Sequence, residues 1–163
     1  MPGIEGAGDR LFRGLSIASS GLSAQRRRIE TAAENIANAE TTRTEAGTPY
    51  RRKVVGLEPG RVLEPGVLKA GELPVDIPAG ELPFPERPDT PGVAVTGVEE
   101  DMSEGPLVYD PGHPDANEDG YVRYPNVRVT DELVSMMEAR RLYEANATVF
   151  DAVKSMLRRA TEI

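Results

Sequence analysis

Two long segments, one near each end of the chain, carry apolar residues at the spacing of an amphipathic helix. In the N-terminal segment, positions spaced alternately four and three residues apart are apolar, except for Gln25. The apolar positions are Leu11, Leu15, Ala18, Leu22, Ile29, Ala32, Ile36 and Ala39. This is the heptad pattern by which one helix packs along another. Asp9 is placed to cap the helix, and the breakers and β-branched residues of Thr41–Pro49 predict its end. Gly14 and Gly21 weaken it by about 1 kcal/mol each relative to alanine.

The C-terminal segment carries two apolar stripes on neighbouring helix faces. The first stripe comprises Val129, Leu133, Met136, Tyr143, Ala147, Phe150 and Leu157. The second stripe comprises Leu142, Ala145, Val149, Ala152, Met156 and Ala160. Thr130 is the predicted cap, and Asp131 and Glu132 complement the helix dipole in the first turn. The first stripe is expected to pack on the N-terminal helix, which leaves the second for the middle of the chain or for other subunits. Subunits are favoured because the middle is poor in apolar residues.

The middle of the chain breaks both helical patterns. It holds 13 of the 14 prolines, all between Pro49 and Pro125, and short strands are predicted at Tyr50–Leu57, Val93–Val98 and Gly120–Tyr124. Most of Glu58–Pro91 is predicted to be extended loop.

These patterns together predict an α+β fold with a small β-strand and loop-rich insert between two long helices that pair as an antiparallel coiled coil. Residues 1–8 are expected to be a flexible N-terminus, and residues 9–46 an N-terminal helix with the start of a linker. Residues 47–125 are expected to form an acidic Pro/Gly-rich insert, and residues 126–163 a C-terminal helix.

Charge follows the same division of the chain. The net charge is −8, yet residues 1–46 and 126–163 each hold six basic and six acidic groups, so the whole excess lies in the insert. An acidic chain is a poor partner for a phosphate backbone. The basic run Arg26–Arg28 spreads around its helix and has Glu30 and Glu34 nearby, which favours a solvated face over a nucleic-acid site. Nucleic acid is therefore excluded as an expected partner.

Cysteine is absent and His113 is the only histidine, which excludes disulfides, thiolate chemistry and multi-histidine metal sites. No cofactor is expected. The N-terminus has neither a basic nor an apolar region of the kind found in signal peptides, and there is no run of about 18 apolar residues. Neither a cleaved signal peptide nor a membrane span is predicted.

One loop offers a candidate calcium site. The run from Asp115 to Gly120, with Asn117 and Asp119 between them, matches the first six positions of an EF-hand loop. The twelfth position, which requires a bidentate carboxylate, falls on Asn126. A calcium-responsive binding module remains an alternative function, against the simpler interpretation that these residues form tight turns.

His113, between Asp110 and Asp115, offers a second candidate site, for proton transfer in a hydrolase. Neither Ser16 nor Ser23 lies in the strand-to-helix turn that exposes a nucleophilic serine. A loop histidine that fixes a turn is the favoured interpretation.

Several segments resemble the bacterial flagellar rod and hook proteins. Ser20–Gln25 and Ala33–Thr42 are similar to the N-terminal signature of that family. Thr48–Lys53, Tyr109–Val122 and Pro125–Val127 narrow the resemblance to proximal-rod members, and Arg141–Asn146 is similar to their C-terminal helix motif. Residues that carry the family motif are Asn35, Ala37, Asn38, Pro111, His113, Pro114, Tyr143 and Asn146. The chain departs from the usual residues at Glu34 and Glu40, where the family has Asn, and at Leu133, where Met is common.

The resemblance implies a structural subunit, not an enzyme, that polymerises helically in the proximal rod of the flagellar basal body and transmits torque. It implies export through the flagellar type III apparatus without a cleaved signal, and a location in the periplasmic part of the rod. Implied partners are further copies of the chain, the other rod proteins, the adaptor at the rod base and the distal-rod neighbours. Residues expected at coiled-coil or intersubunit contacts are Leu15, Leu22, Ile29, Ile36, Leu133, Met136, Tyr143, Ala147, Val149, Phe150, Met156 and Leu157.

Overall fold

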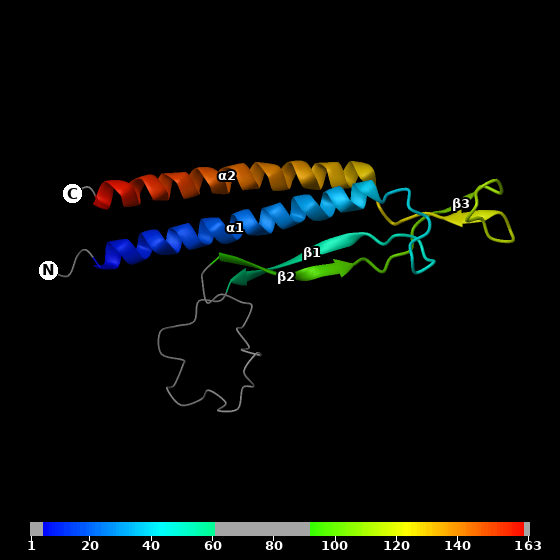
Figure 1. Cartoon of the computed structure of the whole chain (residues 1–163), viewed down its shortest axis with the longest axis horizontal. Coiled ribbons are helices and arrows are strands. Elements are labelled where there is room, and N and C mark those ends of the chain that lie inside the picture. Colours follow the sequence, from blue (N-terminus) through cyan, green and yellow to red (C-terminus); the bar gives the residue numbers. More distant parts are fainter. Residues whose placement is uncertain (1–4, 61–91, 162–163) are drawn as a thin grey trace, which may run out of the picture.

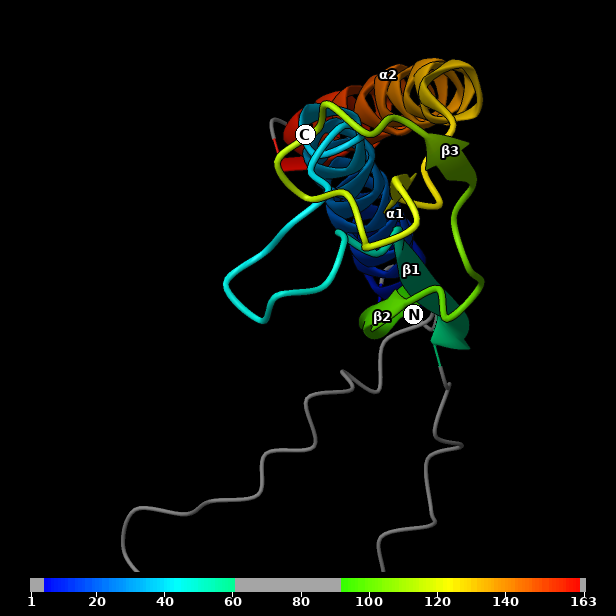
Figure 2. The ribbon, with the colours of Figure 1, turned by 90° about the vertical axis from the view of Figure 1, so that its right-hand side faces the viewer.

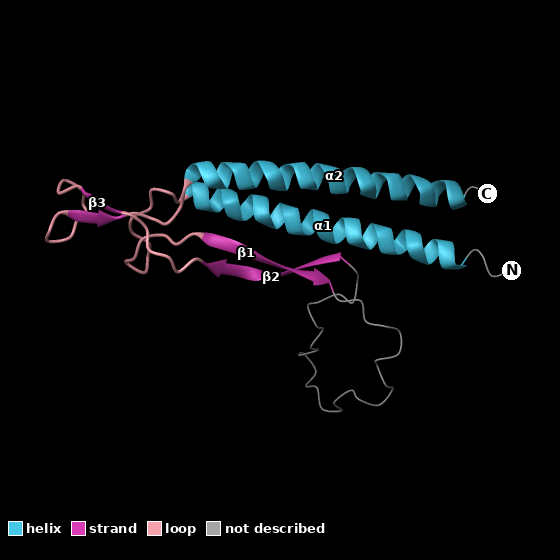
Figure 3. Ribbon diagram, turned by 180° about the vertical axis from the view of Figure 1, so that it is seen from behind, coloured by secondary structure: helices cyan, strands magenta, loops and turns pink. Residues whose placement is uncertain are grey.

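Two long antiparallel helices form the body of the molecule (Figure 1). The computed structural model describes residues 5–60 and 92–161. Helix α1 spans Glu5–Ala37 and helix α2 spans Val129–Thr161, each with 33 residues, or about 50 Å. They lie side by side over their length, so both termini are at one end (Figure 3). The predicted α+β fold with paired terminal helices is confirmed.

Both helices begin at places other than the predicted caps. Helix α1 begins at Glu5, so Asp9 lies inside it, and it ends at Ala37, before the predicted breakers. Helix α2 begins at Val129, and the carbonyl of Arg128 accepts the amides of Asp131 and Glu132 at 3.0 and 3.1 Å. Thr130 is therefore already within the first turn and does not cap the helix.

The most deeply buried positions of the helix pair carry small and polar residues, whereas the large apolar ones are only partly buried. The buried positions of the helix pair include Ala18, Ala24, Thr31, Ala32, Asn35, Glu132 and Ala139. A Cβ on Gly21 would come within 2.7 Å of Asn146 Nδ2, and one on Gly14 would lie 3.7 Å from Val153 Cγ2. Gly21 therefore allows a close approach of the two helices, a benefit that offsets its low helix propensity.

The first hairpin lies along α1, on the side away from α2 (Figure 2). Strand β1 (Lys53–Gly60) pairs antiparallel with β2 (Gly92–Glu100), from Lys53 opposite Glu100 to Gly60 opposite Gly92, with a bulge at Gly56/Leu57. The Val93 amide donates to Ser20 Oγ of α1 at 3.1 Å. Both predicted strands exist: β1 is shifted by three residues toward its C-terminal end, so Glu58–Gly60 belongs to it instead of a loop, and β2 is longer than predicted at both ends. The rest of the predicted loop, residues 61–91, lies outside the described residues.

A second, smaller hairpin projects beyond the end of the helices (Figure 1). Strand β3 (Leu107–Tyr109) pairs with β4 (Tyr121–Arg123), and Val122 is buried while the rings of Tyr109 and Tyr121 meet edge to face at 5.2 Å. The strand predicted at Gly120–Tyr124 is confirmed as β4, whereas β3 was not predicted. Among the described residues no helix is long and apolar enough to cross a membrane.

Candidate assembly surface

The second stripe of α2 is exposed on the surface. Val149 and Met156 are 51% and 54% exposed, and Leu142 is similarly exposed. The smaller members Ala145, Ala152 and Ala160 are exposed as well. Neither α1 nor the described part of the insert covers this stripe, so it is available for contact with another chain.

The first stripe packs on α1 only in part, which corrects the prediction. Met136, Ala147, Phe150 and Leu157 are partly buried, but Val129 and Leu133 are each 42% exposed, and Tyr143 is also exposed. The contact with α1 runs instead through Glu132, Ala139, Asn146 and Val153, a heptad row offset by one residue from Leu133 and Ala147. The periodic pattern identified the helix, but the most deeply buried residues of the contact, Glu132 and Ala139, are polar or small.

Exposed apolar residues therefore flank the α1 contact on both sides of α2. At 100° per residue, Val129, Leu133 and Tyr143 lie on one side of the buried row, and the second stripe lies on the other. Helix α1 adds the exposed side chains of Phe12 and Ile17. Its predicted contact residues Leu15, Leu22, Ile29 and Ile36 are partly buried. We refer to the two exposed sides of α2 together with Phe12 and Ile17 as the assembly surface.

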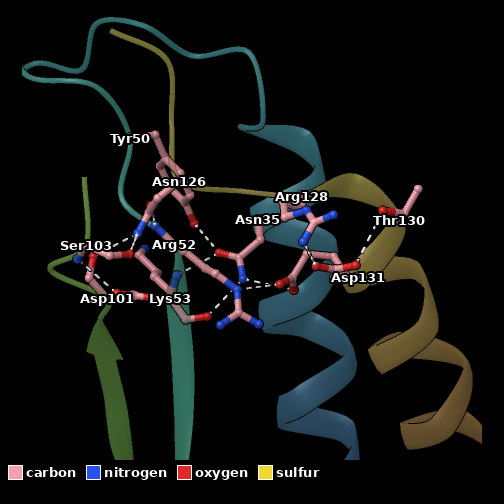
Figure 4. A network of polar contacts seen from close by, with 11 residues as sticks. Asn35, Tyr50, Arg52, Lys53, Asp101, Ser103, Asn126, Arg128, Thr130 and Asp131 are labelled. Carbon is pink, nitrogen blue, oxygen red and sulfur yellow. Dashed lines mark hydrogen bonds and ion pairs between the residues drawn. The ribbon is translucent and has the colours of Figure 1, made fainter. Parts of the chain in front are cut away.

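A buried polar junction holds the first hairpin to the helix pair (Figure 4). At its centre is Asn35 of α1, 1% exposed. Its Nδ2 donates to the Lys53 carbonyl at 2.8 Å and to Glu132 Oε2 at 3.1 Å, and its Oδ1 accepts from the Lys53 amide at 2.8 Å and the Tyr50 hydroxyl at 3.0 Å. All the hydrogen-bonding capacity of one side-chain amide is used, which is what burial of an asparagine requires.

The junction continues from Glu132 to the loops at both ends of the insert. Glu132 is 2% exposed, and its Oε1 accepts from Arg52 Nε at 2.6 Å. The Arg52 amide donates to Asn126 Oδ1 at 2.7 Å, and Asn126 Nδ2 donates to the Asp101 carbonyl at 3.0 Å. One network therefore joins α1, β1, the end of β2 and the segment that leads into α2.

Tyr50 of this junction is expected to make the protein less stable in alkali. Burial, helped by the charges of Glu34, Glu100 and Glu132, raises the pKa of Tyr50 from 10.0 to about 12. Because the folded state holds the phenol proton more tightly, the stabilisation from this group is fully present below about pH 10, and the free energy of unfolding should fall as the pH rises from about 10 to about 12. Urea titrations should show a shallower fall for Tyr50→Phe, and equal slopes would contradict the assignment.

The loop before β4 forms turns, as the simpler interpretation predicted. Asn117 Oδ1 accepts the amides of Asp119 and Tyr121 at 3.1 and 2.8 Å, and Gly120 has a φ of 79°. His113 Nδ1 accepts the amide of Asp115 at 3.1 Å. These contacts account for His113 and Asn117 as turn-forming residues.

Calcium is expected not to bind this loop. Asp115 accepts the Thr42 hydroxyl at 2.7 Å and lies 3.5 Å from Arg43, and these contacts lower the pKa of its carboxyl group. No group of three or more acidic or histidine side chains is placed to hold a metal ion in residues 5–60 and 92–161. Calorimetry with calcium at about millimolar concentration, where weak loops bind, should show no heat of binding. A saturable heat that disappears in Asp119→Asn would contradict this expectation.

Among the remaining motif residues, Asn38 and Pro111 have structural contacts. Asn38 Nδ2 donates to the Glu34 carbonyl at 2.9 Å and its Oδ1 accepts from Thr41 at 3.2 Å, just after α1 ends. Pro111 lies against Gly120, where an added Cβ would be 3.2 Å away. Pro114 and Ala37 are exposed. Arg26 and Arg27 both pair with Glu30 on an exposed face, which also lowers the pKa of Glu30.

Sequence reasoning missed the junction because its members come from distant parts of the chain. Tyr50, Arg52 and Asn126 fell within segments that carry the family resemblance, so a signal for them existed. Glu132 had no signal of its own, since an acidic residue in a first helical turn is ordinarily exposed and complements the helix dipole.

Comparison with known proteins identifies relatives along nearly the whole chain. The family model for the flagella basal body rod protein matches residues 15–43, and the model for the flagellar basal body rod FlgEFG protein C-terminal region matches residues 118–163. The flagellar basal-body rod protein FlgC of Borreliella burgdorferi is 41% identical, over 94% of this chain and 97% of its own length. FlgC of Bacillus subtilis is 38% identical, over 93% of this chain and 97% of its own length. FlgC of Salmonella typhimurium is 39% identical, over 86% of this chain and 88% of its own length.

Proposed function

The chain belongs to the family of flagellar basal-body rod proteins FlgC, and on this premise we propose that it is a structural, non-catalytic subunit of the proximal rod. In this role it assembles through its terminal helices and transmits torque along the rod. The observation that supports the proposal most directly is the assembly surface, because apolar residues flank the α1 contact on both sides of α2. A subunit of a helical tube contacts its neighbours through two different surfaces. A contact that uses the same surface on both subunits closes into a dimer and cannot continue into a filament.

The charge distribution supports close packing of the helices in such a tube. Residues 1–46 and 126–163 are each electrically neutral, so helices from neighbouring subunits can pack without accumulating repulsion. The first hairpin lies on the α1 side, away from α2 (Figure 2). We propose that the helices form the rod wall, that the acidic insert faces outward, and that neighbours include further copies, other rod proteins, the rod-base adaptor and the distal rod.

The proposed route to the rod is export through the flagellar type III apparatus without a cleaved signal, followed by assembly in the periplasmic part of the basal body. We expect such a chain to gain helical order when it is assembled. The ends of the helix pair near the termini lie beyond the first hairpin, and among the described residues only the partner helix lies along each of them there (Figure 1).

Dilute subunit is therefore expected to contain less helix than assembled subunit. Helices without sufficient packing are marginal in water, and association stabilises the folded form by mass action. Circular dichroism over a wide concentration range, compared with polymerised protein, measures the difference. Full helicity that does not depend on concentration would count against coupled folding and assembly.

A further inference from the structure

The outer edge of β1, the edge that does not pair with β2, is open over a short window. Both main-chain groups of Lys53 bond to the Asn35 side chain and not to β2. Because main-chain groups alternate between the two edges of a strand, those of Val55 and Leu57 also point outward. Pro59 lies on the same edge and has no N–H to donate. The window is thus limited by the Asn35 amide at one end and by a proline at the other.

The main-chain groups of Val55 and Leu57 have no hydrogen-bond partner among the described residues. They border a groove of about 400 Å³ that is also lined by Thr31 and Ala32 of α1 and by Ser135 of α2. An unpaired strand edge beside a groove is a place where an extended peptide can add as a further strand.

The charge of the groove selects the kind of segment it would accept. Its lining contains Arg28, Arg52 and Lys53, against the single carboxylate of Glu132. Arg52 is held by Glu132, and Lys53 pairs with Glu34. Arg28 donates only to Gln25 Oε1, at 3.4 Å, and makes no ion pair within the described part of the chain. The groove therefore has a surplus of positive charge with Arg28 available for a carboxylate.

We propose that this groove binds an extended acidic segment of a neighbouring subunit, which adds to β1 as a third strand and pairs a carboxylate with Arg28; this interface rests on the proposed rod function. Residues of α1 and α2 line the groove together with β1, so we propose a single added strand there. Main-chain bonds to Val55 and Leu57 hold the strand, and Arg28 sets the preference for acidic side chains.

The test measures binding of two fluorescent probes to the full-length monomeric protein by anisotropy. The probes are acetyl-Glu-Val-Glu-Val-Glu-amide and acetyl-Lys-Val-Lys-Val-Lys-amide. We expect the acidic probe, and not the basic one, to bind saturably. Its affinity should fall roughly tenfold or more in Arg28→Glu. Binding should be lost when alternate main-chain amides of the probe are N-methylated. Arg27→Glu is the matched control, because it makes the same charge change at an exposed position outside the groove, and it should bind nearly as the unchanged protein does.

Three results would overturn the proposal: no binding of the acidic probe at about millimolar concentration, where weak peptide sites are still detected, equal binding of both probes, or equal weakening by Arg27→Glu and Arg28→Glu. N-methylation without effect would also overturn it, because it would show that β1 adds no strand. None of these results depends on polymerisation. A negative result for peptide binding in the groove can therefore be told apart from a negative result for the proposed rod function. The rod function is tested separately by substitution of Val149, on a different face of α2.

Discussion

Val149→Asp is expected to abolish rod assembly while the subunit is still exported. Val149 lies near the centre of the second stripe and is 51% exposed in the monomer. Burial of such a side chain in an interface contributes about 1.5–3 kcal/mol, and an unpaired carboxylate in the same place adds a desolvation cost. The same loss of binding free energy occurs at every equivalent contact in the polymer. We therefore expect the substitution to abolish assembly and not merely to reduce it.

The measurement is motility in a host that lacks its own copy of this subunit, together with detection of the secreted chain. Met156→Asp, two helical turns further along the same stripe, should give the same non-motile phenotype. Thr148→Asp is the matched control, since it introduces the same charge one residue away on an exposed face about 100° around the helix. If motility survived both stripe variants, the second stripe would not be an intersubunit surface.

Periodicity in the sequence predicted the two helices well, but not which of their residues meet. Steps of four and three in apolar positions identify a helix wherever they occur. The contact between the helices uses Gly21, Ala139 and Asn146, which a search for large apolar residues passes over. Large side chains such as Leu133 remain exposed, as expected for a helix whose remaining partners are other chains.

The sites outside the helices were predictable only where the determinants were local. Turn formation by His113 and Asn117 depends on neighbours within four residues, and that interpretation was correct. Strand β3 is three residues long and is defined by its pairing with β4, so no periodic pattern could reveal it. The burial of Glu132 depends on Arg52, 80 residues away, and local propensity carries no information about such a pair.

Asn35→Ala is expected to lower the free energy of unfolding by about 3 kcal/mol or more. The substitution leaves the Lys53 amide and carbonyl and the Tyr50 hydroxyl without their partners in a buried site, and it removes a donor from Glu132. A buried group without a partner costs about 1–3 kcal/mol, so several together exceed the effect of an ordinary surface substitution. Urea unfolding followed by circular dichroism measures the change.

Asn38→Ala is the matched control, because Asn38 is three residues away and its side chain, among the described residues, bonds only to the nearby Glu34 carbonyl and Thr41 hydroxyl. Its cost should stay near 1 kcal/mol, the usual net contribution of such a bond. Hydrogen exchange separates a local effect from a global one: in Asn35→Ala the Lys53 amide should lose protection before the amides of α1. Equal destabilisation by the two variants, with Lys53 still protected, would mean that the hairpin is held along α1 by packing and by Ser20 instead of the polar junction.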